Sequence, residues 1–268
     1  MSFAELFSDG DYRFHLTLRR AEPREFFFAR DHTGSLLEER QHWLASDPAT
    51  YATILPEGEA ALREFASVAA LWTGSPEFAE PSSSSVDLMR QLGGALEPDI
   101  LFLSADPDGQ FRLRGGALCF PTGWALGEKL GHTMDFIHGV VPGLNPALGG
   151  AIHQFLSRLK PGTAFLRDNW GIAATRELNL HPTRKIPPPS LPTALERLWL
   201  RVEHQALIAL PESRAVVFGI RIALHRLDEV ARSPHRGAFR RAVGTMPSDL
   251  IAYKRLEEIR AYLLNVLE

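Results

Sequence analysis

The stretch GHTMDFIHGVVPG, residues 131–143, places two imidazoles and one carboxylate within seven residues. His132, Asp135 and His138 are residue types that bind transition metals, and two histidines with one carboxylate form the ligand set of a class of non-haem iron centres. In a helix these three side chains would span roughly 120° of the surface, which is wide for three ligands of one ion. The stretch therefore predicts either a metal site or an ordinary helix surface.

A single axial histidine has no such geometric requirement. Haem needs one proximal histidine in an apolar pocket, and the neighbours of His138 are apolar: Ile137, Val140 and Val141. The chain has ten histidines, of which most are expected at the surface or at helix caps. His153, on the next predicted helix, is the rival axial ligand, and His181 is a candidate in a loop.

The composition is that of an ordinary globular protein, with 268 residues, of which 45% are hydrophobic and 23% charged. The formal net charge of −3 predicts no general attraction to nucleic acid. The basic cluster SPHRGAFRRAV at 233–243 is expected to be a solvated face. No apolar run approaches the roughly 18 residues of a membrane span, and the N-terminus lacks the layout of a secretory signal.

Cys119 is the only cysteine of the chain. An intrachain disulfide and a cysteine-based zinc or iron–sulfur site are therefore excluded. We expect Cys119 to be a small core residue and the protein to be cytoplasmic, where thiols stay reduced.

Hydrophobic periodicity and turn residues divide the chain into helices and strands. Helices are expected at 36–54 with a break at Asp47-Pro48, at 56–72, at 85–96, in short pieces within 124–160, and at 246–268. Strands are expected at 99–104, 111–120, 163–174, 196–210 and 214–227. Short helices inserted after the second strand match a PAS-like layout. We therefore expect an α+β fold with a PAS-like five-stranded antiparallel sheet, inserted short helices and flanking N- and C-terminal helices.

The same pattern of helices and strands predicts that the chain divides into three parts. Residues 1–97 form a mostly helical N-terminal extension, 98–230 the PAS-like domain, and 231–268 a C-terminal helical segment that packs on the sheet. The long N-terminal part is expected either to cap a pocket or to bind a partner.

Alternation along the last three strands sorts their residues by face. If these strands are neighbours, one face of the sheet carries six polar side chains: Arg167, Asn169, Arg201, Glu203, Gln205 and Arg221. They are either a solvated face with cross-strand charge pairs or the wall of a pocket covered by the inserted helices. In the second case buried charges must be paired or must serve a ligand.

Three separated blocks of the sequence carry a family resemblance: GGALCFPTGWALGEKLGHTMDFIHGVVPG, FLSRLKPGTAFLRDNWGI and RVEHQALIALPESRAVVFGIRI. They resemble the haem-dependent oxidative N-demethylase family, which is the family of the catalytic alpha subunit of dimethylamine-oxidising enzymes. The likeness runs from about Glu38 to Lys254. It implies a PAS-like domain with b-type haem that uses O2 to remove a methyl group as formaldehyde. It also implies separate reductase subunits that carry NADPH, FMN and iron–sulfur chemistry. This sequence has no Gly-rich dinucleotide fingerprint and no cysteine cluster, which agrees with electrons that arrive from a partner.

The family's motifs recur residue by residue at Ile137, His138, Val141 and Pro142, at Arg167, Asn169 and Trp170, and at Arg201, Glu203 and Gln205. His204 stands where the family pattern has arginine, which leaves the substrate open. His204 also falls on the apolar face of its strand, so we expect a core histidine, and Trp170 is expected to pack.

The resemblance suggests a role for each polar residue. His138 would be the axial ligand of the iron, and Arg167 and Arg221 would meet the haem propionates. Asn169, Arg201 and Gln205 would also serve the cofactor. Glu203 would hold a small amine in its cationic form and take its proton. Two other interpretations stay open: a PAS-like haem sensor or binding module without turnover, and a pocket for a small organic ligand without haem.

Overall fold

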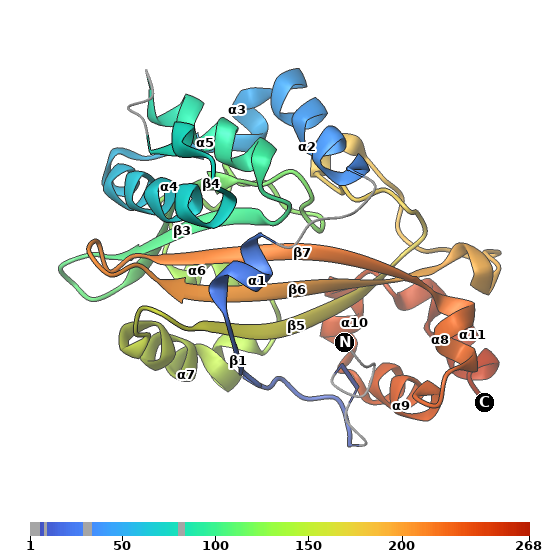
Figure 1. Ribbon diagram of the computed structural model, residues 1–268. Coiled ribbons are helices and arrows are strands. Elements are labelled where there is room, and N and C mark those ends of the chain that lie inside the picture. Colours follow the sequence, from blue (N-terminus) through green and yellow to red (C-terminus); the bar gives the residue numbers. More distant parts are fainter. Residues whose placement is uncertain (1–5, 8–9, 29–33, 80–83) are drawn as a thin grey trace.

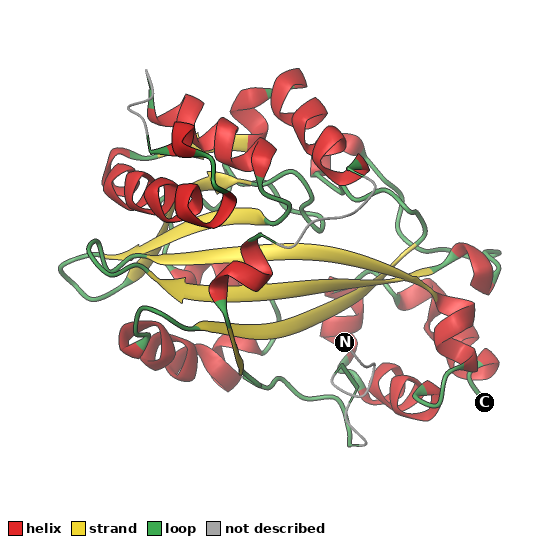
Figure 2. Ribbon diagram, viewed as in Figure 1, coloured by secondary structure: helices red, strands yellow, loops and turns green. Residues whose placement is uncertain are grey.

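The computed structural model describes residues 6–7, 10–28, 34–79 and 84–268, and within them a seven-stranded antiparallel sheet lies between layers of helices (Figures 1 and 2). The order of the strands is β1-β5-β6-β7-β3-β4-β2. The strands are β1 (Arg19–Ala21), β2 (Ala52–Ile54), β3 (Asp99–Ala105), β4 (Phe111–Ala117), β5 (Ala164–Ala173), β6 (Trp199–Ala209) and β7 (Val216–Arg226). The helices are α1 (Pro23–Phe27), α2 (Ser35–Ser46), α3 (Pro48–Tyr51), α4 (Glu59–Thr73), α5 (Ser85–Ala95), α6 (Met134–Gly139), α7 (Leu144–Arg158), α8 (Leu227–Arg232), α9 (Arg236–Thr245), α10 (Ser248–Tyr253) and α11 (Glu257–Val266).

The five strands expected from the sequence are all present, and they are contiguous in the sheet as β5-β6-β7-β3-β4. The expected mixture of helix and sheet is therefore confirmed, but a sheet of only five strands is wrong for the described residues. The missed strands, β1 and β2, are three residues long each. They pair with the outer edges of β5 and β4, and such short segments carry no periodicity of their own. The division into parts at 97/98 and 230/231 stays a prediction.

The N-terminal helices cover one face of the sheet. Apolar residues of α4 and α5, such as Phe65 and Leu92, pack on β3, β6 and β7 in one core cluster. Gly219 of β7 permits a close approach, because an added Cβ there would lie 2.6 Å from the ring of Phe27. The bulky ring of α1 can therefore reach the backbone of the sheet only at a glycine.

The C-terminal helices pack at the other end of the same face. Their apolar side chains meet Trp170, Leu200 and Val202 in a second core cluster. The single helix expected at 246–268 is instead two helices, α10 and α11. The chain breaks between them at Arg255, which has a left-handed φ of 57°. The expected packing of both terminal segments under the sheet is confirmed.

The opposite face of the sheet is covered by α6 and α7, the helices inserted after β4 (Figure 1). Ile152 and Leu156 of α7 pack on Leu101, Leu103 and other apolar residues of the sheet. Thr133 begins α6 as its N-cap, with its hydroxyl accepting from the backbone N–H of Phe136 at 3.2 Å. The histidine-containing stretch therefore lies over a sheet face, as expected.

A buried ion pair joins the N-terminal helices to the sheet. Arg40 of α2 and Asp99 of β3 are both 0% exposed, and Arg40 Nη1 lies 2.7 Å from Asp99 Oδ1. The Asp99 carboxylate also accepts hydrogen bonds from the backbone N–H groups of Cys119 (2.7 Å) and Phe120 (3.1 Å). Arg40 Nε donates to the carbonyl of Gly93 on α5 at 2.7 Å. Segments far apart in the sequence thus meet at one charge pair, and Cys119 is a free, buried core residue as expected.

We predict that Arg40→Met lowers the free energy of unfolding by about 3–5 kcal/mol, because it leaves the Asp99 carboxylate buried without its cation. Urea denaturation followed by circular dichroism measures this loss. The matched control is Arg241→Met, which removes a pair to Asp11 whose side chains are 54% and 66% exposed. This control is expected to cost less than about 1 kcal/mol. Equal losses in the two variants would contradict the role given to the buried pair.

Candidate functional site

Polar side chains from β5 and β6 share the sheet face beneath α6 and α7. The register pairs Arg167 with Gln205 and Asn169 with Glu203. Arg201 lies two residues before Glu203 on β6 and therefore shares its face. Directly opposed residues of an antiparallel pair point to the same face. The predicted shared face is therefore confirmed for these five residues.

The prediction that Arg221 also lies on this face is wrong. Arg221 pairs with His204 in the register, which places it on the opposite face, and its guanidinium forms an ion pair with Glu97. Alternation sorts the residues within a strand, but only the register decides which face of one strand continues that of its neighbour. The cavity side of β7 is instead apolar, with Phe218 and Ile220 facing α7.

A cavity of about 290 Å³ lies between this face, α6, α7 and the C-terminal helices. Apolar side chains form much of its wall, among them Leu103, Met134, Leu144, Ile152, Phe155, Leu156, Leu207 and Phe218. The volume is just below the range of ligand pockets, roughly 300–1,000 Å³. The site is thus a largely apolar cavity with a few polar groups directed into it.

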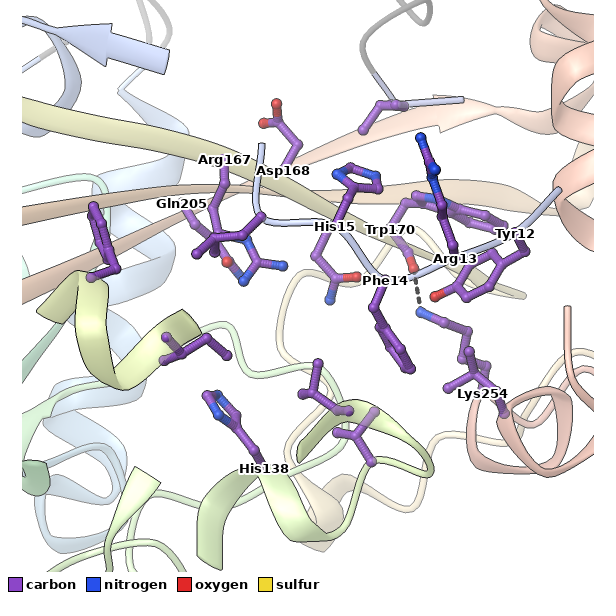
Figure 3. A pocket seen from close by; sticks show the side chains of 18 of the residues that line it. Tyr12, Arg13, Phe14, His15, His138, Arg167, Asp168, Trp170, Gln205 and Lys254 are labelled. Carbon is purple, nitrogen blue, oxygen red and sulfur yellow. Dashed lines mark hydrogen bonds between the residues drawn. The ribbon is translucent and has the colours of Figure 1, made fainter. Parts of the chain in front are cut away.

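Residues 10–16 cross the cavity and form part of its wall (Figure 3). The backbone N–H of Tyr12 donates to Thr245 Oγ1 of α9 at 2.7 Å, which ties this segment to the C-terminal helices. Burial raises the pKa of Tyr12 to about 12, with Arg167 opposing the shift. Residues 10–16 therefore fulfil one of the two expectations for the N-terminal part, since they cap a pocket.

His138 lines the cavity and faces Arg167 across it (Figure 3). Burial, together with the charge of Arg167, lowers the pKa of His138 to about 4. Among the described residues, neither ring nitrogen of His138 has a hydrogen-bond partner. The imidazole is therefore neutral at physiological pH and offers a lone pair, which is the state of a histidine that binds a metal.

The other histidines of the predicted site do not join His138. Among the described residues, His132, Asp135 and His138 do not form a three-ligand metal cluster, and His132 instead stacks on Phe136 with ring centroids 3.9 Å apart. His153 is exposed and bonds through Nε2 to the carbonyl of Gly109 at 3.1 Å. A three-ligand iron centre is therefore not what the stretch builds.

Arg167 is a second polar group of the cavity wall that lacks a partner within the described residues, where it has neither an ion pair nor a hydrogen bond. Burial lowers the pKa of Arg167, while the carboxylates of Glu203 and Asp168 oppose the shift. A guanidinium stays charged in proteins, so the cavity wall holds a cation that no ion pair or hydrogen bond from the described residues binds. Such a group suits a carboxylate or phosphate of a ligand.

Glu203 is the centre of a hydrogen-bonded group. Its carboxylate accepts from Thr122 Oγ1 at 2.6 Å, from Gln205 Nε2 at 2.8 Å and from Asn169 Nδ2 at 3.3 Å. These donors fix the orientation of the carboxylate without neutralising its charge. Glu203 therefore presents an oriented carboxylate that can meet a cation.

Arg201, by contrast, has its guanidinium bound to the protein itself. It is 2% exposed and donates to Thr122 Oγ1 (3.0 Å) and to the carbonyls of Phe120 (2.9 Å) and Leu178 (2.7 Å). Burial lowers its pKa to about 10. Arg201 thus fastens two loops around Glu203.

Lys254, at the end of α10, is a residue of the site that sequence reasoning missed. Its Nζ donates to the carbonyl of Trp170 at 2.7 Å (Figure 3). Burial lowers the pKa of Lys254 to about 8, with Glu203 opposing the shift. Its sequence, IAYKR, reads as an ordinary amphipathic helix, so nothing local could have identified it. Only the tertiary structure brings this lysine into the wall of a cavity that Glu203 also lines.

A second cavity, of about 640 Å³, adjoins the first and shares with it Asn169, Trp170, Tyr253 and Lys254. Glu203 and His181 line the second cavity, and His138 lines the first. The loop Lys185–Pro189 and Arg255 form part of its wall. The carboxylate and the neutral imidazole thus belong to adjoining spaces that Asn169 and Lys254 separate.

His204 and Trp170 lie away from the polar face. His204 Nδ1 is 2.7 Å from Asp168 Oδ1, and the same carboxylate pairs with Arg19 at 2.9 Å. The side chain of His204 is 27% exposed, so the expectation of a core histidine is wrong and this residue is an ion-pair partner. Trp170 packs between Phe7 and Phe239 as expected.

Residues 66–264 match the family model described as haem-dependent oxidative N-demethylase, alpha subunit-like. The match contains His138, Arg167, Glu203 and Lys254, and it begins within α4, after the segment that covers the cavity. The family expected from the sequence motifs is therefore confirmed. The match spans well over half of the chain, and the protein belongs to the haem-dependent oxidative N-demethylase family, as an alpha-subunit-like member.

Proposed function

We propose that this protein oxidatively removes a methyl group from a small secondary amine, using haem b and O2 and releasing formaldehyde. The observation that carries the proposal is the neutral imidazole of His138, which faces the cation of Arg167 across an apolar cavity, neither side chain having a partner among the described residues. Membership of a haem-dependent N-demethylase family supports it. The dimethylamine-like size of the substrate follows from the motif resemblance.

The residues present fit a haem. His138 supplies an uncharged nitrogen for the iron, the apolar wall suits the macrocycle, and Arg167 suits a propionate. Asn169 and Gln205 lie on the same face for further contacts. When bound, the haem would supply the iron at which O2 is reduced. Arg201 and Arg221 are not proposed as haem-binding residues. The guanidinium of Arg201 binds loop carbonyls, and that of Arg221 pairs with Glu97.

Glu203 is proposed to hold the amine. A secondary amine is protonated at neutral pH, and its N–H groups would donate to a carboxylate that Thr122, Asn169 and Gln205 already orient. The same carboxylate would take the amine proton and free the nitrogen lone pair before oxidation. Glu203 is therefore the proposed catalytic residue.

Electrons are proposed to come from a separate reductase that carries NADPH, FMN and iron–sulfur groups. The single, buried cysteine cannot build a cluster, and the sequence has no dinucleotide fingerprint. The alpha-subunit-like character of the family also suggests further subunits. We further propose a PAS-like core, from the insertion of α6 and α7 after the second of five contiguous strands, and a cytoplasmic location. Within the described residues no helix has the length and apolar character needed to cross a membrane.

His138→Ala is expected to shift or abolish the Soret band of protein expressed with added haem, because it removes the proposed iron ligand. The visible spectrum measures this. The matched control is His153→Ala on α7, which should keep the parental spectrum, since His153 bonds to the carbonyl of Gly109. A parental spectrum in His138→Ala would move the ligand elsewhere, and a parent that takes up no haem would end the proposal.

Glu203→Gln is expected to keep the Soret band and to lose the spectral change caused by dimethylamine, because a neutral amide cannot hold the ammonium ion. With a reductase and NADPH, formaldehyde release should fall by about 100-fold or more. An unchanged amine titration would remove Glu203 from this role. Amine binding without any formaldehyde from the parent would instead favour a haem sensor or binding module.

Dimethylamine is expected to bind more tightly as the pH rises from 7 to 9. Lys254, whose pKa burial lowers to about 8, is cationic below that pH and repels the ammonium ion near Glu203; above it Lys254 is neutral. The amine itself stays protonated over this range, as an alkylammonium with a pKa of about 10 does. The expected gain is on the order of threefold. Spectral titration should show it in the parent and not in Lys254→Met, and parallel pH profiles would refute it.

A further inference from the structure

The wall of the second cavity combines opposite charges. Glu203, which is partly buried, contributes a carboxylate, and Lys185 and Arg255 are exposed cations of the same wall. Within the described ranges of the chain, neither Lys185 nor Arg255 has an ion pair or a hydrogen bond from its side chain. Apolar residues form a further part of this wall: Trp124, Ile172, Ala173, Pro187 and Pro188.

Both cationic residues have a backbone conformation that is unfavourable for residues other than glycine. Lys185 has φ of 52° and Arg255 has φ of 57°, in the left-handed region that usually requires glycine. Lys185 ends a short 3-10 helix (Pro182–Arg184), and Arg255 separates α10 from α11. Non-glycine residues in this conformation gather at binding sites, where the surrounding structure holds them. The two positions thus carry a positive charge where a glycine would be the easier choice.

We propose that the second cavity binds an N-methylated amino acid, with its methylammonium group at Glu203 and its carboxylate at Lys185 and Arg255. The inference rests on the proposed function for the amine end and adds the anionic end. A bare dialkylamine would fill little of about 640 Å³ and would leave both cations unused. A zwitterion with a short apolar spacer has a group for each part of this wall, which offers a carboxylate, apolar side chains and cations.

The experiment compares amines by isothermal titration calorimetry on the haem-loaded protein. The ligands are dimethylamine, N-methylglycine and 4-(methylamino)butanoate, which share the methylammonium group and differ in the carboxylate and its distance. We expect at least one of the acids to bind about tenfold more tightly than dimethylamine, since two partly exposed ion contacts are gained. In Lys185→Gln/Arg255→Gln the ratio of the two Kd values should fall to about 1.

Arg214→Gln is the matched control. Arg214 is exposed and has a left-handed φ of 59°, but it lies in the β6–β7 turn and lines neither cavity. The Kd ratio of this variant should equal that of the parent. The Soret band of the double variant is recorded alongside, because loss of haem there would assign the two cations to the cofactor and overturn the inference.

Two further outcomes overturn it: acids that bind no better than dimethylamine in the parent, and a preference for the acid that survives in the double variant. If dimethylamine binds and depends on Glu203 while the acids do not bind, only this inference fails. If haem-loaded protein binds none of the three ligands, the proposed N-demethylase function fails with it.

Discussion

The buried pair of Arg40 and Asp99 is the contact on which the position of the site depends. Asp99 accepts from the backbone N–H groups of Cys119 and Phe120, and the carbonyl of Phe120 accepts from Arg201. Thr122, two residues further, accepts from Arg201 and donates to Glu203. One charge pair under the N-terminal helices is therefore linked, through the loop after β4, to the carboxylate of the site. A buried pair of this kind is weak evidence for net stability, but breaking one half of it is costly.

The two faces of the sheet use their charges differently. On the face of the N-terminal helices, Arg221 pairs with Glu97, and Asp168 pairs with His204 and Arg19. On the cavity face, Arg167 has no such partner in the described part of the chain. Burial without pairing is unfavourable for folding alone, so a cation left in this state is better explained by a ligand than by structure. The departure of His204 from the family pattern falls on the paired face, away from Glu203.

The cavity is assembled from segments that lie far apart in the sequence. Residues 10–16 form one wall, α6 and α7 another, β5 and β6 the floor, and Lys254 comes from the C-terminal helices. The family match begins within α4, so residues 10–16 lie outside the matched region. The part of the site that carries His138, Arg167 and Glu203 lies inside the matched region.

Local sequence alone determined the five long strands, most of the helices and the family, because periodicity and motifs are encoded within short segments. It also selected Arg167, Asn169, Arg201, Glu203 and Gln205 as one polar face. The tertiary structure decided what depends on pairing between distant segments. The register places Arg221 on the other face. The guanidinium of Arg201 donates its hydrogen bonds to loop carbonyls. The packing of α10 places Lys254 in the site, where it donates to the carbonyl of Trp170. The physical reason is that alternation fixes the side of a residue within its own strand, whereas the partners and burial of its charge are set by neighbours far away in the sequence.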